Sequence, residues 1–329
     1  MHVLITGGAG FIGSHLVERM LAEGNTVHVV DDLSTGKATN LAPFLEHPRF
    51  RFCEADIVTW DGISAAAQWS DRIYHLAAVV GVRRVLEDPI QVLATNIAGT
   101  ERLLRAVVTG GWRPRIIIAS SSEAYGFAQD EAFNEQNDLV FRAGGQTRWA
   151  YAVTKLVDEH LAHAFFKKRE LPVTTVRLFN TVGPRQLGRY GMVLPNFVKQ
   201  AVRGVPITVF GDGLQTRSFC DVRDTVCMLD ELGRSEAAVG EIVNVGDDKE
   251  ISIKDLAALV RERAGSQSPI KLVSYVEAYG ESFEDVTHRR PDLTKLRSLI
   301  TYSPKRSLAE TIDDLIRIER TGLGQSASK

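Results

Sequence analysis

The sequence predicts an α/β protein with a doubly wound parallel sheet and a smaller C-terminal lobe. Through the first half of the chain, short runs rich in β-branched residues alternate with longer segments whose apolar residues lie three and four positions apart. This alternation is typical of parallel strands joined by helices that cover both faces of a sheet. A glycine-rich turn directly after the first run, and the loss of the alternation after residue 180, support the same architecture.

The expected elements of the sheet follow one another along the first 180 residues. Short β-branched runs predict strands, and amphipathic spacing over roughly ten or more residues predicts helices. We expect strands at Val3–Thr6, Val27–Asp31, Phe50–Cys53, Ile73–Leu76, Ile116–Ser120 and Val173–Leu178, and helices at Ile12–Glu23, Ile90–Val108 and Ala150–Arg169.

The division into lobes is expected near residue 180. Residues 1–180 would form the sheet and its helices, and residues 181–329 would form a substrate-binding lobe that closes over the ends of the strands. Loops that contain glycine and proline separate shorter elements in this second part. The run Ile242–Val245 reads as a strand, so we expect the chain to return to the first lobe near 235–255.

Composition excludes several classes of protein. Of the 329 residues, 44% are hydrophobic and 24% are charged, which excludes a disordered or fibrous chain. Lys and Arg number 39 against 41 Asp and Glu, so no excess positive charge attracts a nucleic acid. The three cysteines, Cys53, Cys220 and Cys227, are too few and too irregularly spaced for a disulfide framework or a four-ligand zinc site. We therefore expect reduced thiols and no metal.

The N-terminal residues and the lengths of the apolar runs indicate where the protein is located. Met1–Thr6 runs into a glycine turn without the basic region and cleavage site of a secretory signal. No run approaches the roughly eighteen apolar residues that a membrane-spanning helix needs. We expect a soluble, cytoplasmic protein that binds no membrane.

A glycine motif follows the first predicted strand. Gly7, Gly10 and Gly13 are three residues apart, at the point where the strand ends and the first helix begins. Their missing side chains allow a tight turn and the close approach of a pyrophosphate, which the helix N–H groups and dipole stabilise. Asp31 ends the second strand 24 residues after Gly7, where a carboxylate can bind the adenosine ribose and repel a 2′-phosphate. The pattern predicts a Rossmann site for NAD rather than NADP.

A tyrosine and a lysine are candidates for catalysis. Tyr151 and Lys155 are four residues apart on a predicted helix, so their side chains project from one face. A neighbouring ammonium and a positive nicotinamide ring both favour the phenolate, so Tyr151 can act as a base. Ser120–Glu123 follow a strand at the edge where open α/β sheets bind ligands, and a hydroxyl there can orient a substrate oxygen. The alternative for these serines is a turn that caps the next helix.

Further short motifs are spread over nearly the whole chain. They are Thr6–Gly13, Asp31, Asp56–Ile57, His75–Ala78, Asn96–Thr100, Ser120–Gly126, Tyr151–Lys155, Arg177–Asn180, Gly183–Arg185 and Gly211–Arg217. Together they resemble the extended short-chain dehydrogenase/reductases, specifically the NAD-dependent nucleotide-sugar epimerases, dehydratases and decarboxylases. The resemblance implies a Rossmann fold, NAD as cofactor and a UDP-sugar as substrate.

The resemblance also implies which residues form the site. The catalytic group comprises Ser121, Ser122, Glu123, Tyr151 and Lys155. The cofactor residues are Gly7, Gly10, Phe11, Ile12, Gly13, Asp31, Asp32, Asp56, Ile57, Ala77, Ala78 and Asn96, with Tyr151 and Lys155. The substrate residues are Ser121, Glu123, Asn180, Arg185 and Arg217, with Arg289 or Arg290. An arginine fork can hold a diphosphate bidentately, although most arginines are simply exposed.

The expected reaction starts with oxidation of the sugar at C4 to a 4-keto intermediate. The ketone then allows loss of water across C5 and C6, loss of carbon dioxide from a C6 carboxylate, or epimerisation at C4. Glu123 favours the first two outcomes because a plain 4-epimerase needs no extra acid there; its alternative role is to interact with the helix dipole. Thr147–Tyr151 and Ala278–Asp292 resemble UDP-glucuronate decarboxylases, in which the arginine that matches Arg289 meets the substrate carboxylate.

Decarboxylation of UDP-glucuronate is therefore the favoured function. The alternatives are a UDP-sugar 4-epimerase acting on UDP-glucose or UDP-glucuronate, and an NDP-sugar 4,6-dehydratase. A non-catalytic NAD-binding sensor is more distant, because such proteins typically lose the tyrosine or lysine that this chain retains. The helices around 91–108 and 156–168 have wide apolar faces and resemble those of the family's dimer interface, which implies a homodimer.

Overall fold

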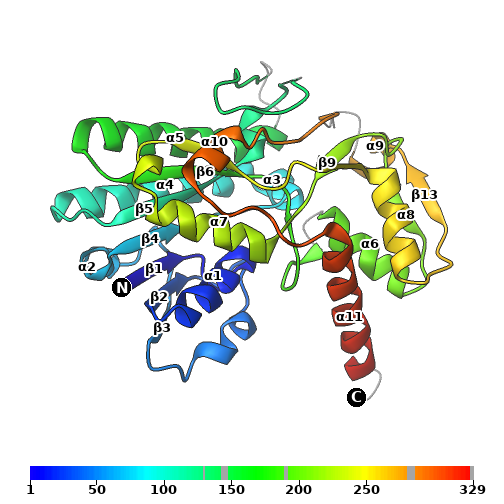
Figure 1. The fold of residues 1–329 in the computed structure, drawn as a ribbon, viewed down its shortest axis with the longest axis horizontal. Helices are drawn as coiled ribbons and strands as arrows, with labels where there is room; N and C mark the ends of the chain where they lie inside the picture. The colour runs from blue at the N-terminus through cyan, green and yellow to red at the C-terminus, as the bar shows by residue number, and fades with distance from the viewer. Residues whose placement is uncertain (129, 142–146, 189–191, 280–285, 327–329) are drawn as a thin grey trace.

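The central element is a seven-stranded parallel sheet, whose strands β3 to β6 follow one another from bottom to top in the left and central part of Figure 1. The computed structural model describes residues 1–128, 130–141, 147–188, 192–279 and 286–326. The strand order is β11-β6-β5-β4-β1-β2-β3, so the chain starts in the middle of the sheet, proceeds to one edge and then reverses. The strands are β1 (His2–Thr6), β2 (Thr26–Asp31), β3 (Phe50–Glu54), β4 (Arg72–His75), β5 (Arg115–Ser121), β6 (Val173–Leu178) and β11 (Ile242–Val245).

Helices cover both faces of the sheet. On β1, Val3 and Ile5 face a core formed with α1 and α7, whereas Leu4 between them faces a core formed with α2, α4 and α5. This alternation is the two-residue period of a strand that is buried on both sides. The helices are α1 (Phe11–Ala22), α2 (Ile63–Trp69), α3 (Val82–Glu87), α4 (Pro89–Thr109), α5 (Ala150–Arg169), α7 (Val222–Arg234) and α10 (Thr294–Leu299).

The predicted fold class is confirmed. Each of the six strands expected before residue 180 is present to within a residue or two, and all of them pair in parallel. The helix expected at 12–23 begins one residue earlier, because Gly10 is its N-cap. Beyond residue 180, β11 pairs with β6 in parallel, with Ile242 opposite Thr175.

The smaller lobe lies to the right in Figure 1 and has its own apolar core. Leu194 and Phe197 of α6, Leu256 of α8 and Ile312 of α11 pack there against Ile207 of β8. Within its described residues, the lobe contains three short strand pairs, β7 with β10, β9 with β12 and β8 with β13. Its elements are β7 (Thr181–Val182), α6 (Val193–Val202), β8 (Ile207–Phe210), β9 (Thr216–Ser218), β10 (Cys220–Asp221), β12 (Glu250–Ser252), α8 (Ile253–Arg263), β13 (Ile270–Val273), α9 (Tyr275–Tyr279) and α11 (Leu308–Ser326).

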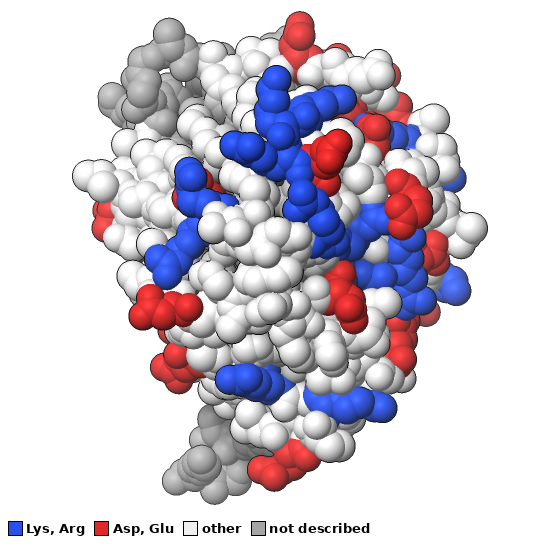
Figure 2. Space-filling model, turned by 90° about the vertical axis from the view of Figure 1, so that its left-hand side faces the viewer, with Lys and Arg blue, Asp and Glu red and all other residues white. Residues whose placement is uncertain are grey.

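The surface carries charges of both signs. On the face shown in Figure 2, acidic side chains lie between and beside groups of basic ones. Such a face presents no field of a single sign. In the described part of the chain, no helix is long and apolar enough to cross a membrane. Within the same ranges, no group of three or more His, Cys, Asp or Glu side chains could hold a metal ion.

Candidate active site

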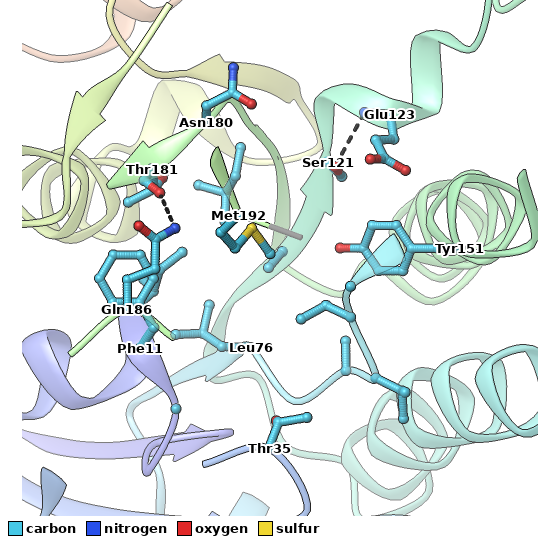
Figure 3. A pocket seen from close by; sticks show the side chains of 18 of the residues that line it. Phe11, Thr35, Leu76, Ser121, Glu123, Tyr151, Asn180, Thr181, Gln186 and Met192 are labelled. Atoms are coloured by element: carbon cyan, nitrogen blue, oxygen red, sulfur yellow. Dashed lines mark hydrogen bonds between the residues drawn. The ribbon is translucent and has the colours of Figure 1, made fainter. Parts of the chain in front are cut away.

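A cavity of about 740 Å³ lies at the carboxyl ends of the strands, between the sheet and the smaller lobe. The glycine turn after β1 and the ends of β2, β4, β5 and β6 form one side of it. Residues of α6, β8 and β9 form the other side. The position agrees with the rule that open α/β sheets bind ligands where the strand order reverses. Figure 3 shows side chains from both lobes converging on this space.

The glycine turn provides a cradle without side chains. Gly7 has a φ of +74°, and a Cβ on it would lie 2.7 Å from the backbone nitrogen of Ala77. A Cβ on Gly13 would overlap the carbonyl oxygen of Gly7 and lie 2.8 Å from the Cα of Gly8. Gly10 is the N-cap of α1, and no side chain caps this end of the helix. Because Gly10 and Gly13 line the cavity, the positive end of the helix dipole lies beside it. The turn therefore fits the diphosphate of a dinucleotide.

Asp31 lies at the end of β2 and lines the same cavity. Its Oδ2 accepts a hydrogen bond from the Ala9 amide at 2.9 Å, and its Oδ1 accepts one from Leu33 at 2.8 Å. Burial raises the pKa of this carboxyl above its ordinary value. The other predicted cofactor residues that line the cavity are Gly7, Gly10, Phe11, Ile12, Gly13, Asp32, Asp56, Ile57, Ala77 and Ala78.

Asn96 differs from the other predicted cofactor residues because it lies behind the cavity wall. It is buried, and its Oδ1 accepts a hydrogen bond from the Val79 amide at 2.7 Å. Its Nδ2 donates to the Val79 carbonyl at 3.2 Å and to the Thr154 hydroxyl at 3.2 Å. Val79 itself lines the cavity. Asn96 thus acts on the site through the loop that it holds.

The predicted catalytic group gathers in one place. Ser121 is the last residue of β5, and Ser122 and Glu123 begin the short 3-10 helix η3 (Ser122–Tyr125). All three line the cavity together with Tyr151 and Lys155 of α5. In Figure 3 the Tyr151 hydroxyl points into the cavity, with Ser121 and Glu123 beside it. The Ser121 hydroxyl also accepts a hydrogen bond from the Glu123 amide at 3.2 Å.

The surroundings of Tyr151 raise the pKa of its phenol above its ordinary value. Burial raises its pKa most, and the negative charges of Glu123 and Asp158 raise it further, while the hydrogen bond with Ser121 lowers it. The Lys155 Nζ lies 5.9 Å from the Tyr151 ring centroid and 3.1 Å from the Asp158 Oδ2. The sequence pattern pairs Lys155 only with Tyr151. The structure shows that Lys155 also pairs with the buried carboxylate of Asp158, which offsets the lysine charge.

The predicted substrate residues separate into two groups. Asn180, Arg217 and Arg289 line the cavity. Arg185 instead forms an ion pair with Glu18 of α1 at 2.6 Å and is not part of the lining. The Arg290 Nε lies 3.5 Å from the Glu250 Oε2, and Arg290 is also outside the lining. Of the two neighbouring arginines that the sequence left open, Arg289 is the one in the cavity.

Arg289 and Glu123 face each other across the site. The Arg289 Nη1 lies 3.6 Å from the Glu123 Oε1. The arginine side chain is buried, and one-quarter of the glutamate side chain is exposed. The distance exceeds that of a hydrogen bond, so the pair is a long ion pair. This places a positive and a negative group next to Tyr151, Ser121 and the space between the lobes.

A buried network supports α5 from below the site. Glu159 accepts hydrogen bonds from the Arg177 Nε at 2.8 Å and Nη2 at 2.7 Å, and from the Ser120 hydroxyl at 2.6 Å. The Arg177 guanidinium also lies 4.4 Å from the Tyr125 ring centroid. The Tyr125 hydroxyl donates to Asn244 of β11 at 2.8 Å. The helix that carries Tyr151 is thereby fixed to β5, β6 and β11.

Sequence reasoning missed most of the smaller lobe's contribution. The Gln215 Nε2 donates to the Phe210 carbonyl and the Tyr275 hydroxyl, both at 3.0 Å. The Gln186 Nε2 donates to the Thr181 carbonyl at 3.0 Å, and Figure 3 shows this bond at the cavity wall. Gln186 and Tyr275 belong to none of the motifs, whereas Gln215 lies within Gly211–Arg217 without a role assigned to it. The three residues come from distant segments of the chain. Residues 280–285, part of the segment that resembles UDP-glucuronate decarboxylases, lie outside the described residues.

The fold and the site define an NAD-dependent enzyme that acts on nucleotide sugars. The chain belongs to the NAD dependent epimerase/dehydratase family, whose model matches residues 3–246. That match includes the glycine turn, Asp31, the serines after β5, Tyr151 and Lys155.

Two relatives and one solved structure are similar over almost the whole chain. The UDP-N-acetyl-alpha-D-glucosaminuronate decarboxylase of Bacillus cytotoxicus is 35% identical and covers 96% of this chain and 98% of its own. The UDP-glucuronic acid decarboxylase 1 of Xenopus tropicalis is 34% identical over 99% of this chain and 74% of its own. The UDP-glucuronic acid 4-epimerase of Bacillus cereus, solved with UDP-glucuronic acid and NAD, has a TM-score of 0.87 and 30% identity, over 98% of this chain and 99% of that one.

Proposed function

We propose that this enzyme decarboxylates a UDP-linked hexuronate, with UDP-glucuronate as the first candidate, through a 4-keto intermediate. The observation that carries the proposal is the position of Arg289, a buried cation in the cavity 3.6 Å from Glu123. A guanidinium recognises a carboxylate by charge and by paired hydrogen bonds. A sugar carboxylate at C6 is therefore a natural partner for this residue. The two decarboxylase relatives support the same assignment.

The first step is the oxidation of the sugar at C4. We assign Tyr151 as the base that removes the proton of the C4 hydroxyl, and Ser121 as the residue that orients this hydroxyl. The glycine turn and Asp31 would hold NAD, which would supply the acceptor for the hydride from C4. Asn180 and Arg217 are assigned to the nucleotide sugar, where an arginine can pair with a phosphate.

The second step breaks the bond between C5 and C6. With a ketone at C4, the C6 carboxylate belongs to a β-keto acid, so its loss as carbon dioxide leaves the electron pair in an enolate over C5, C4 and the C4 oxygen. Arg289 holds the carboxylate in place before the bond breaks. Glu123 lies on the side of the cavity where it can manage the proton that C5 gains. Return of the hydride to C4, with the proton passed back from Tyr151 to the C4 oxygen, would then give a UDP-pentose.

The test is a product assay. Purified enzyme is incubated with NAD and UDP-glucuronate, while carbon dioxide release and the sugar product are followed. Decarboxylation with formation of a UDP-pentose is expected. Unchanged UDP-glucuronate would exclude it as the substrate, and conversion to UDP-galacturonate alone would overturn the proposal by identifying a 4-epimerase. Arg289→Lys should reduce carbon dioxide release by about 100-fold, because a lysine cannot form the bidentate pair.

The matched control is the neighbouring arginine. Arg290→Lys changes the same side chain one residue away, outside the cavity and beside Glu250. It should retain carbon dioxide release within about threefold. Equal losses in the two variants would contradict the assignment of Arg289 to the carboxylate.

A second substrate is favoured by one observation. The relative from Bacillus cytotoxicus, which matches nearly the full length of both chains, is named for UDP-N-acetyl-alpha-D-glucosaminuronate. This sugar carries the same C6 carboxylate, so it would use the same residues for decarboxylation. It is therefore assayed in parallel with UDP-glucuronate, and the ratio of the two kcat/KM values identifies the preferred substrate.

A further inference from the structure

Asn244 is a fully buried polar side chain at the edge of the sheet, on β11. Its neighbours Val243 and Val245 face the apolar core that includes α7, so the two-residue period of the strand turns Asn244 to the opposite face. A buried amide is costly unless its polar atoms are hydrogen-bonded. The partners of Asn244 therefore show which parts of the molecule it holds together.

The side chain of Asn244 connects three segments of the chain. Its Oδ1 accepts a hydrogen bond from the Tyr125 hydroxyl at 2.8 Å. Its Nδ2 donates to the Phe133 carbonyl at 2.7 Å and to the Asp292 carbonyl at 3.3 Å. The backbone N–H of Asn244 donates to the Glu135 Oε1 at 2.7 Å, which fixes the segment around Phe133 to the same strand. Asn244 thus joins η3, the segment around Phe133 and the segment that ends at Asp292.

Arg289 lies on an extended segment that Phe133 holds in place. The Phe133 amide donates to the Arg290 carbonyl at 2.8 Å, and the Phe133 carbonyl accepts a hydrogen bond from the Asp292 amide at 2.9 Å. Arg289, just before this pair of bonds, lines the cavity. Because Asn244 binds both the Phe133 carbonyl and the Asp292 carbonyl, it fixes the segment that carries Arg289.

Tyr125 connects Asn244 to Glu123 on the other side of the ion pair. Tyr125 is the last residue of η3, two residues after Glu123, and it has no exposed surface. Its ring stacks on the Phe133 ring with 4.6 Å between the centroids. The hydroxyl bond with Asn244 and this stack together set the orientation of η3. Asn244 is therefore connected to both members of the pair that Arg289 forms with Glu123.

We propose that Asn244 is a positioning residue that sets the distance between Arg289 and Glu123 across the cavity. This distance determines where the C6 carboxylate of the substrate is held when the bond between C5 and C6 breaks. A displacement of about 1 Å can slow a reaction about 100-fold, even when the altered residue is far from the reacting atoms. The inference rests on the proposed function, which assigns Arg289 to the carboxylate and Glu123 to the C5 proton.

Oxidation at C4 depends on groups that are fixed by other contacts. Ser121 ends β5, which pairs with β6 up to that residue. Tyr151 lies on α5, which Glu159 fixes to the sheet through its own buried hydrogen bonds. Loss of the Asn244 side chain should therefore slow the second step of the reaction and leave the first step in place.

The first experiment measures both steps on one substrate. Asn244→Ala removes the three side-chain hydrogen bonds, and single turnovers are run with the UDP-hexuronate that the product assay identifies. NADH absorbance reports oxidation at C4, and released carbon dioxide reports the second step. Carbon dioxide release should fall about 10- to 100-fold, while NADH formation stays within about threefold, so NADH accumulates. Equal losses in the two steps, or unchanged carbon dioxide release, would overturn the proposal.

The matched control is Val243→Ala, on the same strand. Val243 is as fully buried as Asn244, but it packs in the core on the opposite face of the sheet. The substitution should lower stability and leave the ratio of the two rates unchanged. If Val243→Ala changed this ratio as much as Asn244→Ala does, the effect would come from a general loosening of β11, and the proposal would fail.

A double-variant cycle tests whether Asn244 acts through Arg289. Asn244→Ala is introduced into the wild type and into Arg289→Lys, and carbon dioxide release is measured in all four proteins. In the Arg289→Lys background the second substitution should cost less than about threefold, because the guanidinium that Asn244 positions is already absent. Losses that multiply independently would overturn the proposal.

The possible failures can be told apart. If Asn244→Ala does not fold, Asn244→Ser keeps a polar group in a smaller side chain and is held to the same outcomes. A wild-type enzyme that oxidises UDP-hexuronates at C4 without releasing carbon dioxide would overturn the proposed function and this inference with it. A wild type that releases carbon dioxide, with both steps slowed equally in the Asn244 variant, would overturn this inference alone.

Discussion

The buried pair of Arg177 and Glu159 offers the sharpest test of how the active-site helix is held. Replacing Arg177 by Met leaves the Glu159 carboxylate, which is 2% exposed, with Ser120 as its remaining partner. The change removes two charge-assisted hydrogen bonds of 2.8 and 2.7 Å and the contact of the guanidinium with the Tyr125 ring. Removing one partner of a buried ion pair typically costs about 3–5 kcal/mol. For a chain of 329 residues, whose unfolding entropy is about 0.7 kcal/mol/K, that corresponds to a fall of roughly 4–7 °C in Tm.

The assay is differential scanning calorimetry of the wild type, Arg177→Met, and the double variant Arg177→Met/Glu159→Met. The double variant removes both charges, so it should recover at least half of the loss in Tm, because a matched apolar pair replaces an unpaired ion. Arg203→Met is the surface control, since its partner Glu319 and the arginine itself are partly exposed; its cost should stay below about 1 kcal/mol. A double variant as unstable as Arg177→Met, or an Arg177→Met no worse than Arg203→Met, would refute the reasoning.

Three further predictions address the cofactor site and pH. Gly13→Ala should reduce NAD affinity at least about 100-fold by calorimetric titration, because the new Cβ overlaps the Gly7 carbonyl, whereas Gly322→Ala, whose Cβ meets nothing within 4 Å, should bind NAD as the wild type does. Asp31→Asn should weaken NAD about tenfold and narrow the preference over NADP, as measured by paired titrations; unchanged discrimination would contradict the assignment. Burial lowers the pKa of His75 to about 3. Below pH 6.5 the unfolded chain therefore binds a proton that the folded chain does not bind. As the pH decreases from 6.5 toward 3, the free energy of unfolding should decrease by up to about 1.4 kcal/mol per pH unit. His75→Asn should lose less stability than the wild type between pH 6.5 and 4 in denaturant titrations, and an equal loss would contradict that account.

Much of the larger lobe could be predicted because its signals are local. A strand such as Ile116–Ser120 is read from its own β-branched residues, and the glycine turn is read from its spacing. Tyr151 and Lys155 were found because a helix brings residues four apart onto one face. The succession of strand, turn, helix and acidic residue is visible in the order of the residues themselves, so it can be predicted from a single sequence.

The remaining features depend on side-chain directions and on contacts between distant segments. Nothing local distinguishes Arg289 from Arg290, yet one faces the cavity and the other faces Glu250. Asp158 and Lys155 are only three residues apart in the sequence, but nothing local shows that both side chains of this ion pair are buried. The same holds for the smaller lobe, where β8 pairs with β13 some sixty residues later.

The place of β11 at the edge of the sheet has a consequence for biosynthesis. Its partner β6 ends at residue 178, but the hydrogen bonds that complete that edge come from residues 242–245, more than sixty residues later. During translation, at roughly 5–20 residues per second, β6 therefore waits several seconds as an open edge. A nascent chain halted in this interval exposes a strand that can pair with other chains, and this is the stage at which a chaperone has most to protect.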